Sequence, residues 1–143
     1  MIGKTSEYAI RALVYIYLEN QAGKRPGFRE IAKGINSPVQ FTAKVLQKLT
    51  RGKILSSMKG RGGGFFFEQP EAPLNLYEVI RVLEGEVFFY KCGFGLQQCN
   101  CENPCPIHDD YGPVRDGYTR LVKKETIQSL ASKIDSRNGV LAR

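Results

Sequence analysis

The stretch that decides the fold is FREIAKGINSPVQFTAKVLQKLTRGKILSSMKGRGGGFFF, residues 28–67. It opens with a short helical pattern over residues 28–34, after which the chain must turn. The pair Ser37-Pro38 then places a capping side chain directly before a proline, which is favoured at the first position of a helix. We therefore predict a second helix that runs to about Thr50. A short helix, a tight turn and a capped helix are together typical of a helix-turn-helix.

The second half of this stretch predicts a β-hairpin. Residues 54–59 have the pattern of a strand, and the three phenylalanines at residues 65–67 form the returning strand. Four of the five residues from 60 to 64 are glycine, so this segment must turn. Helices followed by such a hairpin predict a winged helix-turn-helix, with the hairpin as its wing. The glycine run lacks the GxxxxGKS/T spacing of a nucleotide-binding loop, and core packing is the alternative explanation for the phenylalanines.

A helix-turn-helix uses its second helix to contact DNA. The N-terminal residues of that helix face base edges in the major groove, so we predict base contacts from Val39, Gln40, Ala43 and Lys44. Glutamine pairs with adenine through two hydrogen bonds, and lysine reaches guanine acceptors. An ordinary solvated helix face is the alternative for these residues. Further DNA contacts, to phosphates or through the wing, are predicted from Ser37, Lys48, Arg51, Ser56, Ser57, Lys59 and Arg61.

The flanking segments are also predicted to be helical. Residues 5–19 have one apolar face, with Thr5 as the expected cap and Glu7 in the first turn, where the helix dipole favours an acid. Downstream of the hairpin, a helix is predicted to begin at its cap Asn75 and to end at Gly85.

The C-terminal region predicts a long helix and a short one. Pro113 indicates that the long helix is either kinked there or begins near Gly112, and Thr126 is expected to open the short final helix. Apolar residues of the long helix alternate at four and three residues, which is a heptad seam; they are Ile107, Tyr111, Val114, Tyr118 and Leu121.

Charge is distributed unevenly along the 143 residues, whose formal net charge is +7. Residues 1–68 carry 12 basic and 4 acidic side chains, whereas residues 69–143 carry 9 and 10. This asymmetry predicts a polyanionic partner for the N-terminal half, with simple solubility as the alternative. No apolar run reaches the ~18 residues of a membrane span and no cleavable signal is evident. We therefore expect a cytoplasmic protein without a membrane partner.

All four cysteines lie within residues 92–105, and His108 follows three residues later. Clustered cysteines without an export signal indicate metal binding or redox chemistry. No C-x-x-C pair occurs, which disfavours a zinc ribbon, whereas an iron–sulfur cluster takes mainly thiolates and sometimes one histidine. An iron–sulfur cluster, a zinc site and unligated thiols remain open at this point. No Ser/His/acid or paired-carboxylate arrangement is present, so an enzyme is not expected.

The two halves together resemble one family, the IscR/NsrR/CymR-type (Rrf family) winged-helix transcription regulators. The resemblance covers nearly the whole chain. In the N-terminal half it rests on Tyr8-Ala9-Ile10-Arg11-Ala12-Leu13, Ile31-Ala32, residues 37–49 and the wing at residues 55–65. In the C-terminal half it rests on Leu76-Tyr77-Glu78-Val79-Ile80, Leu83-Glu84-Gly85, three cysteines and Thr126-Ile127-Gln128-Ser129-Leu130.

The resemblance implies a homodimer, joined through the long C-terminal helix, with two winged domains on a pseudo-palindromic DNA operator. Cluster-binding members of the family hold a [2Fe–2S] or [4Fe–4S] cluster with three loop cysteines. These cysteines map onto Cys92, Cys99 and Cys105 of this sequence.

The fourth cluster ligand differs between members of the family. In some it is a histidine shortly after the third cysteine, which maps onto His108. In others it is an acidic residue at the start of the first helix of the partner subunit, which maps onto Glu7. Compensation of the helix dipole is the alternative role for Glu7. The extra thiol of Cys101 is an alternative to Cys99 as a ligand.

Together these observations predict a mostly α-helical protein with a small β-hairpin wing. Residues 1–70 are expected to bind DNA, and residues 71–143 to dimerise and to carry a cysteine-rich sensor loop at about 90–108. The predicted function is a transcription regulator, a repressor, that senses iron–sulfur status, nitric oxide or redox stress. Alternatives are a cluster-free regulator that acts through a metabolite or partner protein, a small electron-transfer protein, or a zinc adaptor.

Overall fold

The computed structural model describes residues 2–137 and 140–142. Its elements, in chain order, are α1 (Lys4–Gln21), α2 (Phe28–Gly34), α3 (Val39–Arg51), β1 (Ser56–Met58), β2 (Gly64–Phe66), α4 (Leu76–Glu84), the 3-10 helix η1 (Glu86–Tyr90), α5 (His108–Lys124) and α6 (Ile127–Arg137). The tight turn between α2 and α3, and the antiparallel hairpin that follows, confirm the predicted winged helix-turn-helix.

The core of the protein is built around α1. Its residues Ala9, Leu13 and Ile16 are fully buried, and α2, α3, α4 and α6 pack against this helix. The three- and four-residue spacing of these apolar side chains puts them on one face of the helix. The predicted helix is therefore confirmed, but Thr5 is not its cap. The helix begins one residue earlier than predicted, and Gly3 occupies the capping position.

The helix-turn-helix differs from the prediction at the start of α3. Pro38 has an extended backbone, with φ −59° and ψ 132°, and α3 begins at the next residue, Val39. The hydroxyl of Ser37 hydrogen-bonds the hydroxyl of Thr42, and no side chain caps the helix. The prediction that Ser37 caps this helix is wrong, because Pro38 rather than Ser37 holds the capping position and has no side-chain acceptor.

The wing is a short antiparallel hairpin in which Ser56 lies opposite Phe66 and Met58 opposite Gly64. Its first strand is shorter than the predicted residues 54–59. The N–H groups of Ile54 and Leu55 instead donate to the carbonyl of Leu49, at 3.0 and 3.4 Å, and continue the end of α3. Because these N–H groups already donate to the end of the helix, they cannot donate to a neighbouring strand.

In the C-terminal half the predicted cap Asn75 is confirmed, and Thr126 opens α6 as predicted. The side chain of Asn75 accepts a hydrogen bond from the N–H of Glu78 at 2.9 Å, and the hydroxyl of Thr126 accepts one from the N–H of Ser129 at 2.9 Å. Each bond satisfies a donor that the first turn of a helix otherwise leaves unpaired. The Glu78 carboxylate pairs with Arg81 at 2.6 Å rather than folding back to the cap.

The long helix α5 begins at His108 and continues through Pro113. The predicted alternative of a start near Gly112 is therefore wrong. Proline has no N–H, so one hydrogen bond of the first two turns is missing.

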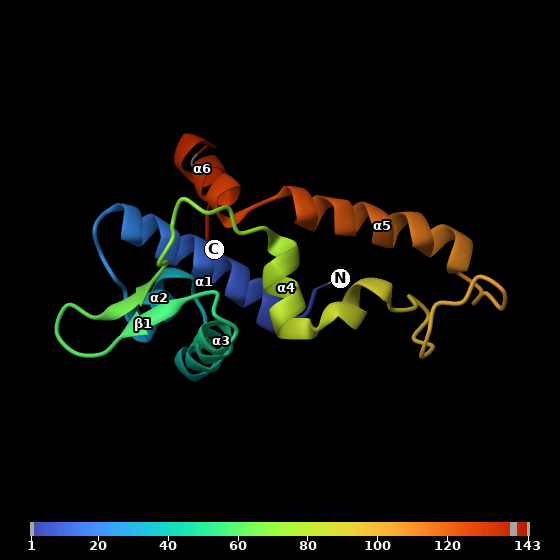
Figure 1. Cartoon of the computed structure of the whole chain (residues 1–143), viewed down its shortest axis with the longest axis horizontal. Coiled ribbons are helices and arrows are strands. Elements are labelled where there is room, and N and C mark those ends of the chain that lie inside the picture. Colours follow the sequence, from blue (N-terminus) through green and yellow to red (C-terminus); the bar gives the residue numbers. More distant parts are fainter. Residues whose placement is uncertain (1, 138–139, 143) are drawn as a thin grey trace.

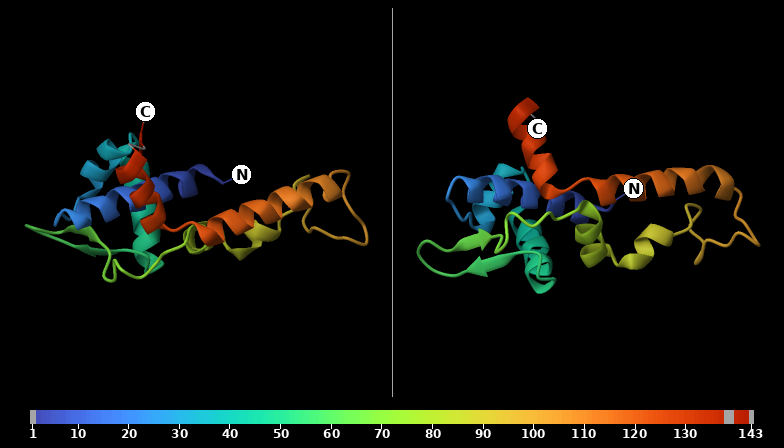
Figure 2. Two further views of the ribbon diagram at one scale, coloured as in Figure 1. Left: turned by 90° about the horizontal axis from the view of Figure 1, so that it is seen from above. Right: turned by 45° about the horizontal axis from the view of Figure 1, so that its top comes forward.

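The wing and the cysteine-bearing segment lie at opposite ends of the molecule (Figure 1; Figure 2). α1 and the helix-turn-helix form one end together with the hairpin. α4, η1 and α5 extend to the other end, where residues 91–107 form a loop without helix or strand. α6 returns to pack on α1. Among the described helices, none is both long and apolar enough to cross a membrane.

Candidate nucleic-acid interface and cysteine site

The helix α3 separates a buried face from a polar one. Thr42, Val45, Leu46 and Leu49 are buried in the core. The opposite face is more exposed, and carries Gln40, Ala43, Lys44, Gln47, Lys48 and Arg51. Three of these side chains are cationic, so the helix presents positive charge to the solvent in the way that a DNA-binding helix does.

The polar face of α3 and the inner face of the wing enclose a groove of about 360 Å³. Its walls combine polar and apolar side chains, namely Phe28, Gln40, Ala43, Lys44, Gln47, Thr50, Ser57 and Phe65. Ser57 and Phe65 are paired across the hairpin, so the same face of both strands meets α3. The structure thus brings Gln40, Ala43 and Lys44 together with Ser57, four residues that the sequence predicted to contact DNA.

Sequence reasoning missed Gln47 and Phe65 as members of this groove. Gln47 lies seven residues after Gln40 and three after Lys44, so helical periodicity of the polar side chains was a signal for it. Phe65 had no such signal, because three consecutive phenylalanines do not reveal which of them faces α3.

The other predicted DNA residues lie around this groove. Lys59 and Arg61 are exposed in the turn of the hairpin. Ser37 and Val39 are half-buried at the start of α3. Ser56 lies on the opposite face of the hairpin from Ser57, and its hydroxyl donates to the carboxylate of Glu68 at 2.6 Å.

A cation that the sequence analysis did not single out also lies on the wing. The guanidinium of Arg25 is 4.0 Å from the ring centroid of Phe66 and 3.8 Å from the sulfur of Met58. It belongs to the loop between α1 and α2 and covers the outer face of the hairpin. A cation over an aromatic face is a stabilising arrangement.

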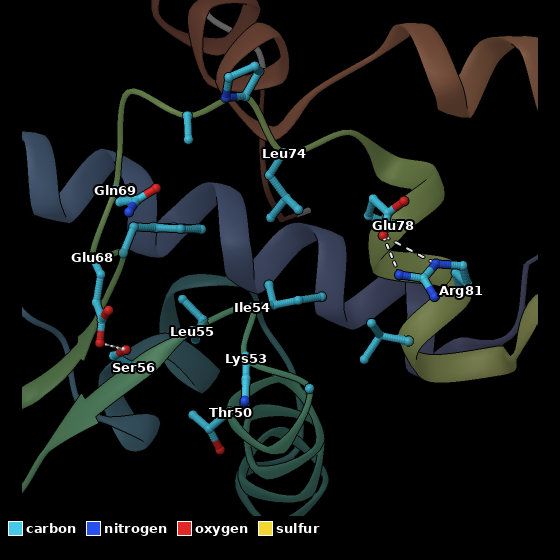
Figure 3. A pocket seen from close by; sticks show the side chains of 15 residues that line it. Thr50, Lys53, Ile54, Leu55, Ser56, Glu68, Gln69, Leu74, Glu78 and Arg81 are labelled. Atoms are coloured by element: carbon cyan, nitrogen blue, oxygen red, sulfur yellow. Dashed lines mark hydrogen bonds and ion pairs between the residues drawn. The ribbon is translucent and has the colours of Figure 1, made fainter.

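A second hollow, of about 620 Å³, lies between the end of α3, the base of the wing and α4. Figure 3 shows Ile54, Leu55 and Leu74 in its middle, with polar residues on either side. Its charged residues balance, because the acidic Glu68 and Glu78 match the basic Lys53 and Arg81. This hollow therefore lacks the excess positive charge of the α3 groove.

The four cysteines lie in the loop before α5, and none of them forms a disulfide. Cys92 is buried, Cys99 and Cys105 are half-buried, and Cys101 is exposed. Gly93 allows the loop to approach α5, because a Cβ atom there would lie 2.5 Å from the ring of Tyr111. Close packing of this kind positions Cys92 next to the long helix.

Cys92 and Cys105 lie close enough for each thiol to affect the ionisation of the other. Backbone N–H groups of Leu96 and Phe94 stabilise the thiolate of Cys92 and lower its pKa. Burial raises the pKa of Cys105, and the charges of the neighbouring cysteines raise it further. The pair therefore has one thiol that ionises more readily than the other.

Cys99 lies between a histidine and an arginine. Its sulfur is 3.4 Å from Nδ1 of His108, the first residue of α5. A hydrogen bond to Cys99 raises the pKa of Arg115, so the guanidinium stays charged beside this thiol. Arg115 was not predicted from the sequence, because only the fold of the loop over α5 brings it to Cys99.

The predicted metal ligands do not form one group. Among the described residues, no three His, Cys, Asp or Glu side chains converge closely enough to hold a metal ion. Glu7 pairs with Lys4 at 3.1 Å in the first turn of α1, and that end of α1 lies away from the tip of the cysteine loop (Figure 1). Cys101 is exposed to solvent.

The predicted heptad seam of α5 divides into two sets. Ile107, at the N-terminal end of the helix, is 36% exposed, and Val114 and Leu121 are 56% and 51% exposed. Tyr111 and Tyr118 are half-buried, and burial raises the pKa of Tyr118 to about 12. The aliphatic residues at seven-residue spacing therefore form a row of exposed apolar side chains on one face of α5.

A helix-turn-helix with a basic outer face and an adjoining wing defines the protein as a winged-helix transcriptional regulator rather than an enzyme. The chain belongs to the Rrf2 family, described as iron-dependent transcriptional regulators, which matches residues 2–133.

Individual relatives match most of the chain. Protein aau3 of Rhizobium meliloti (strain 1021) is 30% identical over 111 residues, 76% of this chain and 66% of that protein. The HTH-type transcriptional regulator NsrR of Oceanobacillus iheyensis is 23% identical over 128 residues, 89% of this chain and 86% of that protein. The structure of CymR (YrzC), the global cysteine regulator of B. subtilis, has a TM-score of 0.74 at 18% identity, and the match covers 92% of this chain and 96% of that one.

Proposed function

We propose that the protein is a homodimeric repressor that binds a pseudo-palindromic DNA operator and responds to iron–sulfur status, nitric oxide or redox stress. The observation that carries this proposal is the groove shared by the polar face of α3 and the inner face of the wing. In this proposal residues 1–70 bind DNA, and residues 71–143 dimerise and sense. It acts in the cytoplasm, where a transcription regulator meets its DNA.

The DNA contacts follow from the position of each side chain. Gln40, Ala43 and Lys44 face the bases together with Val39, and Gln47 extends this surface by one turn. The exposed cations later in α3, Lys48 and Arg51, meet phosphates and give affinity without sequence preference. Phosphate and wing contacts are assigned to Ser37, Lys48, Arg51, Ser56, Ser57, Lys59 and Arg61. Ser56 contributes only when its hydroxyl leaves Glu68.

The dimer is proposed to form through α5. Ile107, Val114 and Leu121 leave a row of exposed aliphatic side chains along this helix. In aqueous solution, a second copy of the chain shields such a row of apolar side chains from water by packing against it. Pairing two subunits through α5 would present two α3 helices to successive major grooves of one operator.

The cysteine loop is proposed to hold an iron–sulfur cluster, either [2Fe–2S] or [4Fe–4S]. Cys92, Cys99 and Cys105 are the thiol ligands, and their chemistry suits iron. The loop must contract to bring Cys99 together with Cys92 and Cys105. His108 is the favoured fourth ligand because its imidazole already lies 3.4 Å from Cys99; Glu7, supplied across the dimer, is the alternative. The description of the family as iron-dependent supports this assignment.

The cluster, when bound, supplies redox and nitric oxide reactivity. The residues of this chain hold it between η1 and the start of α5. A change in the loop is transmitted along α5 to the dimer contact and alters the spacing of the two α3 helices. A coupling free energy of ~1–3 kcal/mol would change operator affinity about 5- to 150-fold.

Anaerobic purification with absorbance spectroscopy and counting of iron and sulfide tests the cluster. We expect Cys92→Ala, Cys99→Ala and Cys105→Ala each to lose the cluster while the fold survives. Cys101→Ala is the matched control, because Cys101 is exposed. This variant should retain a full cluster. Retention of the cluster in one of the first three variants would remove that residue from the ligand set.

A cluster-free regulator of the same fold is the second candidate. It is favoured by the absence of three converging ligands among the residues that the structure describes. A colourless, iron-free protein that cannot be reconstituted but still binds its operator would establish this candidate instead. About one zinc per chain would indicate a zinc adaptor.

A further inference from the structure

The outer edge of the wing is bonded to the last turn of α1 by one side chain, that of Asn20. Its Oδ1 accepts a hydrogen bond from the N–H of Phe67 at 3.0 Å. Its Nδ2 donates to the carbonyl of Phe65 at 3.2 Å and to the carbonyl of Lys24 at 2.9 Å. The amide group therefore pairs with β2 on the side away from β1, as the backbone of a third strand would do.

The loop after α1 continues this contact along the same edge. The N–H of Phe65 donates to the carbonyl of Pro26 at 2.9 Å. Gly64 has φ +144°, and a Cβ atom there would lie 2.1 Å from the carbonyl oxygen of Arg25. Only glycine allows the loop to approach β2 this closely. One turn before Asn20, the ring of Tyr17 packs edge-on against Phe67 at 6.0 Å.

A wing of two three-residue strands needs such support. An isolated two-stranded hairpin is at best marginally stable in water, and its free edge would leave backbone groups unpaired. The groups of β2 that point outwards are instead bonded to α1 and its loop. Because α1 is the central helix of the core, this bonding fixes the direction in which the hairpin extends (Figure 1).

We propose that Asn20 is a positioning residue for DNA binding, which holds the wing so that Lys59 and Arg61 reach the duplex. The inference rests on the proposed DNA-binding function. Asn20 itself touches no DNA. Without it the hairpin samples many directions, and ordering it on the duplex costs conformational entropy that offsets the gain from the wing-tip cations.

A double-mutant cycle tests this role with the full-length dimer and the duplex that the wild-type protein selects from a random-sequence library. Arg61→Ala should weaken binding of the wild type about tenfold. In an Asn20→Ala background the same change should weaken binding by less than about threefold, because the misdirected wing no longer contributes. Lys44→Ala, on α3, should have an equal effect in both backgrounds. General destabilisation would not produce this difference between wing and helix.

Gln21→Ala is the matched control, since Gln21 is the exposed neighbour of Asn20 in the same turn. It should leave the effect of Arg61→Ala unchanged. Equal effects of Arg61→Ala in the wild-type and Asn20→Ala backgrounds would overturn the positioning role. Failure of the wild type to select any duplex would instead overturn the proposed function, so the two failures are distinguishable.

A second variant covers the case in which Asn20→Ala does not fold. Asn20→Asp keeps the acceptor for Phe67 and replaces the donor to Phe65 and Lys24 by a carboxylate oxygen. We expect it to fold and to reduce the effect of Arg61→Ala below that in the wild type. An undiminished effect in this variant would likewise overturn the positioning role.

Discussion

Whether a side chain caps a helix depends on its position at the helix start to within one residue. Asn75, Ser37 and Thr5 are all residue types that cap helices, and all three were predicted to do so. Only Asn75 of these three lies at the capping position itself and bonds into the first turn. Thr5 lies inside α1, whose capping position is held by Gly3, and Ser37 lies one residue before the cap of α3, which is Pro38.

Asn75→Ala should lower the free energy of unfolding by ~1 kcal/mol, since it leaves the N–H of Glu78 without its side-chain acceptor. Urea unfolding followed by circular dichroism measures the change. Thr5→Ala is the control, because Thr5 makes no cap bond, and its effect should stay within ~0.5 kcal/mol. An equal loss in both variants would contradict the assignment of the caps.

The elements of the N-terminal half combine into a surface that none of them forms alone. α3 contributes polar and cationic side chains, and the hairpin contributes Ser57 and Phe65 on the face that meets α3. In the proposed complex, positions near the start of α3 would face bases, whereas Arg51 at its end would lie nearer the DNA backbone. The two kinds of contact have different energetic signatures.

Lys44→Ala should cost ~1–3 kcal/mol of binding free energy at particular base pairs and relax sequence preference there. Arg51→Ala should instead weaken binding to all sequences alike and flatten the dependence of affinity on salt. Fluorescence anisotropy with operator variants at several salt concentrations separates the two. A sequence-dependent effect of Arg51→Ala would show that it reads bases.

In the C-terminal half, elements are joined by side chains that no local pattern marked as connectors. Gln128 of α6 donates to the carbonyls of Pro70 and Ala72, at 3.2 and 2.9 Å, and accepts from the N–H of Leu74 at 3.1 Å. These bonds hold the segment between the wing and α4. The heptad pattern of α5 was evident from the sequence, but which of its residues turn inwards was not.

The whole molecule places the helix-turn-helix and wing at one end and the cysteine loop at the other, with α4 and α5 between them (Figure 2). The two ends are linked through the hydroxyl of the buried Ser6 on α1, which donates to the carboxylate of Glu84 on α4 at 2.9 Å. Communication between the ends is therefore expected to depend on the packing of these helices and on the proposed dimer contact of α5.

Val114→Glu combined with Leu121→Glu should convert the dimer into monomers, because two carboxylates would be buried in an apolar contact. Analytical ultracentrifugation measures the mass in solution, and operator affinity should fall with it. Arg120→Glu is the control, since Arg120 is exposed on the same helix outside the apolar row. A dimer that survives the double substitution would exclude this face of α5 as the contact.

Local sequence alone indicated the α-helices and the wing, though not all of their bounds, together with the N-cap at Asn75 and the heptad spacing of α5, because apolar periodicity and turn chemistry act over only a few neighbouring residues. Tertiary structure decided which phenylalanine meets α3, that Asn20 bonds the wing, and that Arg115 and His108 flank Cys99. These contacts join residues that are distant in the chain or lie on irregular loops. They depend on how whole helices pack, and no local pattern encodes that packing.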